Sequence, residues 1–201
     1  PKAADKAFLV RRFYIIGETN MEDQMLIDAA LSCGAAKATL LDQQKIVLSD
    51  TFRAICESNQ CGGYGKCWMC PPYIGEIHQL MDTVRSFPRG LWFQTISDIE
   101  DSYDIEGMFE AGARHARVSG RIREKVAPLL KKPVLLLSCG GCHLCEVCAK
   151  QADKPCRFPD QALSSLEGYG VDVYNTTKDT DLKYINGQNT VTYFGIVLFS
   201  E

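Results

Sequence analysis

The chain has 201 residues, 46% of them hydrophobic, so it is long enough to bury a core without the disulfides that a mini-protein needs. A formal net charge of −3 gives no electrostatic basis for binding nucleic acid or an anionic membrane. No apolar run approaches the roughly 18 residues of a membrane span, and the first residues do not resemble a signal peptide. We therefore expect a cytoplasmic protein.

Hydrophobic periodicity predicts alternating helices and short strands. In chain order they are a helix over 21–31, strands over 38–41 and 45–48, a helix over 74–87, a strand over 90–97, a helix over 104–130, a strand over 134–138, a short helix opening at Pro159, and a strand over 190–200. Asn186-Gly187 indicates a hairpin turn before the last strand, which is apolar on both faces and therefore central. The pattern predicts a single α+β domain over 1–201, with a central mixed or antiparallel sheet flanked by helices.

Nine of the ten cysteines lie in two predicted loops, 56–72 and 139–159, and only Cys33 lies outside them. The first loop carries Cys56, Cys61, Cys67 and Cys70, followed by two prolines; the second carries Cys139, Cys142, Cys145, Cys148 and Cys156. In a reducing compartment, clustered thiols indicate metal rather than disulfides.

The second loop repeats cysteine at every third position through Cys142, Cys145 and Cys148. This spacing is typical of 4Fe–4S sites, whose last ligand comes from further along the chain, here Cys156. Structural zinc more often uses two separated Cys-x-x-Cys pairs, and zinc stays the alternative metal. Cys139 is then surplus: it could replace a neighbour, but we favour a thiol that is not a ligand.

Cys139 to His143 also matches the Cys-x-x-Cys-His motif of haem c attachment. Haem attachment would require export and two thiols that a cluster also needs. We therefore expect His143 to be a polar neighbour of the cluster rather than a ligand.

The first loop is rich in glycine but does not match a phosphate-binding loop, because Gly65-Lys66 is followed by cysteine. We expect Gly62, Gly63 and Gly65 to let the backbone approach a cofactor closely. The simplest assignment is a second 4Fe–4S site held by Cys56, Cys61, Cys67 and Cys70. Tyr64 and Trp68 either shield that site from water or are ordinary core aromatics.

These motifs resemble those of a prokaryotic family described only as predicted metal-binding proteins, the domain of unknown function 2284. The resemblance rests on Cys56, Cys61, Tyr64-Gly65, Trp68, Cys70-Pro71-Pro72, Cys142, Cys145, Cys148, Cys156-Arg157, Pro159 and the segment 165–173. It implies a metal, most simply iron–sulfur, in mainly anaerobic bacteria and archaea, and it implies no known reaction.

The family pattern does not require cysteine at position 67. If Cys67 is not a ligand, three thiols leave one iron of the first cluster open, and an open iron can bind a substrate as a Lewis acid. If Cys67 is a ligand, the closed site carries electrons or supports the fold.

Other candidate residues carry weaker patterns. His78 and His115 lie on predicted helices, where lone histidines are usually surface or core polar groups. Arg114, Arg117 and Arg121 share one helical face, which is either solvated or receives an anion.

Three functions remain: an electron-transfer or redox accessory protein with two 4Fe–4S clusters and a redox partner protein in anaerobic metabolism, an iron–sulfur enzyme with an open iron, and a zinc-stabilised binding module. We favour the first.

Overall fold

The computed structural model of the chain describes residues 20–130 and 133–200. Within these residues a five-stranded sheet has the order β1-β2-β5-β3-β4. The strands are β1 (Lys37–Asp42), β2 (Arg89–Asp98), β3 (Leu135–Ser138), β4 (Ser164–Ser165) and β5 (Thr190–Phe199). Neighbours pair antiparallel except β3 and β4, which are parallel. The predicted α+β fold with a mixed sheet is confirmed.

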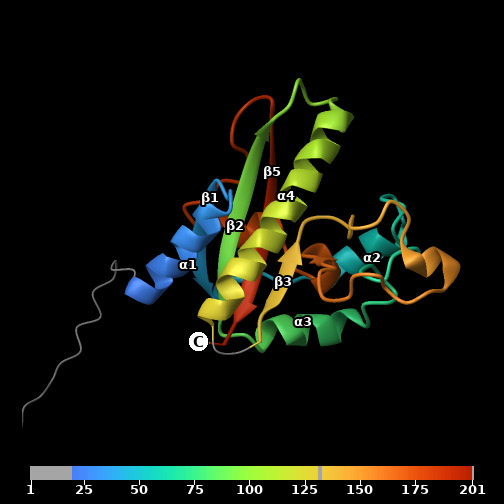
Figure 1. Cartoon of the computed structure of the whole chain (residues 1–201), viewed down its shortest axis with the longest axis horizontal. Coiled ribbons are helices and arrows are strands. Elements are labelled where there is room, and N and C mark those ends of the chain that lie inside the picture. The colour runs from blue at the N-terminus through green and yellow to red at the C-terminus, as the bar shows by residue number, and fades with distance from the viewer. Residues whose placement is uncertain (1–19, 131–132, 201) are drawn as a thin grey trace, which may run out of the picture.

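Helices pack on both faces of this sheet (Figure 1). They are α1 (Met21–Ser32), α2 (Thr51–Glu57), α3 (Ile77–Arg85), α4 (Ile105–Val126) and α5 (Val173–Lys178). Polar side chains cap three of them: Asn20 accepts from the Asp23 amide at the start of α1, Asp104 from the Gly107 amide at the start of α4, and Asp172 from the Asn175 amide at the start of α5. No helix in the described parts of the chain is long and apolar enough to cross a membrane.

Strand β5 is central, as its sequence predicts, and contributes to both halves of the core. Val197 and Phe199 pack with α1 and α4, whereas Ile196 and Leu198 pack with α3 and the segment before α5. All four side chains are buried. Burying both faces explains why this strand is apolar at nearly every position.

Three predicted elements are wrong. Residues 45–48 form no strand; a 3₁₀ turn (Gln43–Lys45) ends there, and Leu48 makes a single bridge to Val171. The chain after Pro159 forms a turn and then β4, not a helix. Asn186-Gly187 closes no hairpin, because no strand lies between α5 and β5 and the partners of β5 are β2 and β3.

Two helices were not predicted, and both are short. α2 spans seven residues and α5 spans six, so neither is long enough to show a helical repeat.

His115 is a core polar group, one of the two roles expected of a lone helical histidine. It is fully buried on α4, with Nδ1 2.9 Å from Thr95 Oγ1 and Nε2 2.9 Å from the Phe194 carbonyl oxygen. Burial lowers its pKa to about 4, although the contact with Phe194 raises it.

His115 is expected to make the fold sensitive to acid. The pKa of His115 is near 6.5 in the unfolded chain and about 4 in the folded protein. Below pH 6.5 the unfolded chain therefore binds a proton that the folded protein does not, and the free energy of unfolding falls as the pH drops toward 4. The loss is about 3 kcal/mol. Urea unfolding at pH 7, 5.5 and 4 should show wild type losing about that much more stability than His115→Gln. Parallel losses in the two proteins would contradict this role.

Candidate metal centre

The two cysteine loops lie side by side on one side of the molecule (Figure 1). The first loop leaves α2, which ends at Glu57, and makes a series of turns before α3. The second loop leaves β3 and includes a 3₁₀ turn (Ala149–Ala152) before β4. The sheet thus holds the start of the second loop, and the first loop packs against it.

Trp68 fastens the first loop to the second. Its indole Nε1 donates to the Lys154 carbonyl oxygen at 2.8 Å, and its ring meets Tyr73 edge-on, with centroids 5.1 Å apart. Lys150 of the second loop lies 5.1 Å from the Trp68 ring centroid and 4.6 Å from that of Tyr73. Through these hydrogen-bond and cation–π contacts Trp68 joins the two loops. The sequence predicted instead that it shields the first site from water or is an ordinary core aromatic.

Five cysteines from both loops line one narrow cleft. The second loop supplies its four predicted ligands, Cys142, Cys145, Cys148 and Cys156, and the first loop supplies Cys67. Cys67 is only 8% exposed. The sequence grouped Cys67 with the first loop, whereas the fold directs it into the cleft of the second.

Neighbouring thiols connect the cleft to the rest of the first loop. The pKa of Cys67 is about 11: the neighbouring Cys142 thiol lowers it, but the neighbouring Cys70 thiol and burial together raise it more. The same contact with Cys67 lowers the pKa of Cys70.

A backbone amide points at one sulfur of the cleft: the Met69 N–H donates to Cys67 Sγ at 3.4 Å. Contact with Cys67 and burial raise the pKa of Cys142, while the backbone of Leu144 and of Leu163 acts to lower it. Amide hydrogen bonds to cysteine sulfur are one of the means by which proteins set iron–sulfur potentials. All five side-chain donors of the cleft are thiols, and this donor set fits an iron–sulfur cluster.

Cys56, Cys61 and Cys70 form the remaining set in the first loop. Burial, followed by the charge of Cys61, raises the pKa of Cys56, and the charges of Cys61 and Cys56 both act on Cys70. A Cβ added at Gly63 would lie 3.4 Å from Cys70 Sγ and 3.7 Å from Cys61 Sγ. Gly63 therefore leaves the two sulfurs room beside the backbone, and its contact with a cofactor stays a prediction.

At the other two predicted cofactor-binding positions, the backbone conformation explains why the residue is glycine. Gly62 and Gly65 have φ of 73° and 70°, and an added Cβ would meet no atom within 4 Å at either position. They serve the turns of the loop, and their contact with a cofactor stays a prediction.

The two sets of thiols are close together. A Cβ added at Gly141 in the second loop would lie 3.7 Å from Cys70 Sγ in the first. The thiols of both Cys70 and Cys142 act on the pKa of Cys67. The sequence could not show whether Cys70 and Cys142 meet; in the fold they are neighbours.

The two cysteines not expected to be ligands occupy different surroundings. Cys33 is buried where α1 ends, in the core beside α4. Cys139 follows β3, and burial, followed by the charge of Glu167, raises its pKa to about 12. Neither residue lines the five-cysteine cleft.

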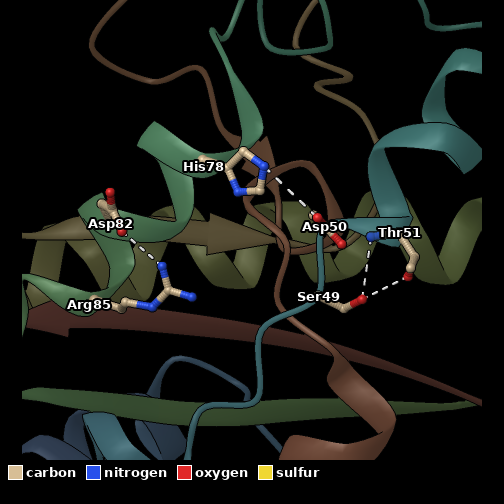
Figure 2. A network of polar contacts seen from close by, with 6 residues as sticks. All are labelled: Ser49, Asp50, Thr51, His78, Asp82 and Arg85. Carbon is tan, nitrogen blue, oxygen red and sulfur yellow. Dashed lines mark hydrogen bonds and ion pairs between the residues drawn. The ribbon is translucent and has the colours of Figure 1, made fainter.

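Neither exposed histidine lines the cleft, although His143 lies between two residues that do, Cys142 and Leu144. Figure 2 shows His78 at the start of α3 facing Asp50, with Nε2 3.9 Å from Oδ2 and the His78 side chain 75% exposed. It is the surface group that its sequence predicts. His143 is also exposed, on the second loop.

No group of three or more His, Cys, Asp or Glu residues within 20–130 and 133–200 is spaced to hold a single metal ion. The thiols instead form two adjoining sets on an α+β scaffold.

The scaffold and these sets define a cysteine-rich α+β protein with adjacent thiol clusters. Residues 39–199 match the sequence profile of the family described as "Predicted metal-binding protein (DUF2284)", and the chain belongs to that family, as its motifs predicted. No curated protein and no solved structure matches the chain.

Replacing Trp68 tests the contact between the loops. Trp68→Phe keeps an aromatic ring for Lys150 but removes the hydrogen bond to Lys154, which should lower the free energy of unfolding by about 1 kcal/mol. Urea unfolding measures the loss. Tyr103→Phe is the control, because Tyr103 is 85% exposed and should change nothing. Equal stability of all three proteins would contradict the contact.

Proposed function

We propose that the protein binds two 4Fe–4S clusters and transfers electrons, as a redox accessory to a partner protein. The observation that carries the proposal is that the two thiol sets adjoin: a Cβ added at Gly141 in the second loop would lie 3.7 Å from Cys70 Sγ in the first, and Cys67 lines the cleft of the second loop. Electron tunnelling slows steeply with distance, so clusters on adjoining thiol sets would exchange electrons rapidly. The Met69 amide, directed at the Cys67 sulfur in the cleft of the second loop, would contribute to the potential of a cluster there.

A second candidate function, an iron–sulfur enzyme, is favoured by the position of Cys67. Because Cys67 lines the cleft of the second loop, Cys56, Cys61 and Cys70 are left as the donors of the first set. Three thiols on a cubane leave one iron without a protein sulfur, and that iron could bind a substrate.

Glu167 is an oxygen donor available near this first set. Its charge adds to the raised pKa of Cys139, after burial, and of Cys56, after burial and Cys61. Burial raises the pKa of Glu167 itself. A carboxyl group in this position could complete the coordination of an open iron or exchange a proton with a bound substrate.

Metal analysis separates the proposal from a zinc-stabilised module. Protein purified without oxygen should be brown and contain about eight iron and eight sulfide per chain, as two cubanes require. About four iron and four sulfide per chain would mean that the protein binds one cluster rather than two. A colourless protein with stoichiometric zinc and no sulfide would overturn both iron–sulfur functions.

Serine variants assign the two sets. Cys61→Ser should lose the iron of the first cluster, and Cys145→Ser that of the second, each about half of the total. Cys67→Ser should keep the first cluster, because the fold places Cys67 in the other cleft. Iron content and EPR of the reduced variants are the measurements.

Cys33→Ser is the matched control and should keep all its iron, since Cys33 lies in the helical core. If Cys67→Ser instead gives the spectrum of Cys61→Ser, the first site is a closed four-cysteine site and the enzyme candidate is wrong.

A further inference from the structure

A pocket of about 280 Å³ lies between α4 and the start of the second loop. One wall is α4, where Ala113, Ala116 and Gly120 provide space by their small size. The opposite wall is the chain over 138–144, which includes Cys139 and Cys142. The pocket therefore shares the Cys142 segment with the five-cysteine cleft.

The charged groups of this pocket favour a monoanion. Arg117 and Arg123 from α4 line it, together with the single carboxylate of Glu124. Among the described residues, neither guanidinium has an ion-pair or hydrogen-bond partner, and Glu124 makes no ion pair. The formal charge of the lining is thus +1 with His143 neutral. A guanidinium presents paired N–H donors that match the two oxygens of a carboxylate.

The rest of the lining favours a ligand with an apolar body. Most of the wall is apolar, with Leu144 and Leu163 beside the small residues of α4. The volume is just below the usual range for small-molecule sites, so it suits a ligand of roughly ten non-hydrogen atoms. Hydroxyl and imidazole groups are available from Ser138 and His143.

We propose that this pocket binds a small organic monocarboxylate with an apolar body. The guanidinium groups of Arg117 and Arg123 hold the carboxylate, and the apolar body lies against α4 and the second loop. The sequence predicted that the arginine face of this helix is either solvated or binds an anion, and the arginines of this face differ in position. Arg117 lines the pocket, whereas Arg114 lies outside it beside Ser97.

The pocket and the clusters can be tested separately. Binding of the carboxylate rests on the pocket alone, while any effect of the ligand on a cluster rests on the proposed function. Calorimetry on the full chain, purified without oxygen, therefore reports on the pocket whether or not iron is present.

Benzoate is the probe, and benzamide is its uncharged counterpart of nearly the same shape. Benzoate should bind in the millimolar range or tighter, and benzamide at least about tenfold more weakly. Arg117→Gln and Arg123→Gln should each weaken benzoate about tenfold. Arg114→Gln, on the same helix but outside the pocket, should leave its affinity within about twofold.

Gly120→Leu tests the location of the site. A Cβ added at Gly120 meets no atom within 4 Å, so leucine would fill the pocket without a clash and improve the helix propensity. Benzoate binding should then be lost while the thermal unfolding temperature stays the same or rises.

Three results would overturn the proposal. They are no benzoate binding up to about 10 mM, benzoate binding that survives Gly120→Leu, and equal losses for Arg114→Gln and Arg117→Gln. A colourless, iron-free protein that still binds benzoate through Arg117 would support the pocket and contradict only the cluster function.

Discussion

The contact between the two cysteine loops is the interaction on which the candidate metal centre depends. In the sequence these loops are separated by α3, β2, α4 and β3, so neither can bring its thiols to the other by local structure. The bond from Trp68 to the Lys154 carbonyl and the thiol contacts of Cys67 hold them together. The indole N–H has one direction in which it can donate, and this gives the contact a defined geometry.

The sheet determines where this contact can form. β5 lies between β2 and β3 and is covered on both faces, so β3 is fixed in the interior of the fold. The second loop begins where β3 ends, and β4 returns parallel to β3 after it. Both ends of the second loop are thereby anchored to one edge of the sheet, and the first loop, which leaves the short helix α2, packs against it.

Some of this structure could be predicted because its signals are local. The long helix α4, the central strand β5 and the two cysteine loops each have a periodicity or spacing that belongs to one segment. The errors at 45–48 and after Pro159 have a common cause. The amide of Ser49 bonds to Gly170 and that of Leu166 to Ser138, so contacts distant in sequence set the backbone there. The arrangement of the thiols was unpredictable for the same reason.

Cys67 shows what spacing alone cannot decide. Its neighbours in sequence, Cys61 and Cys70, assign it to the first loop, yet the turn from Cys67 to Cys70 directs the two side chains to different sets. The segment over 138–144 has a similar double role. It carries Cys142 into the five-cysteine cleft, and it forms one wall of the pocket between α4 and the second loop. A ligand that moved this segment would move the Cys142 thiol with it. Any effect of such a ligand on metal affinity would, by thermodynamic reciprocity, be matched by an equal effect of the metal on the affinity for the ligand.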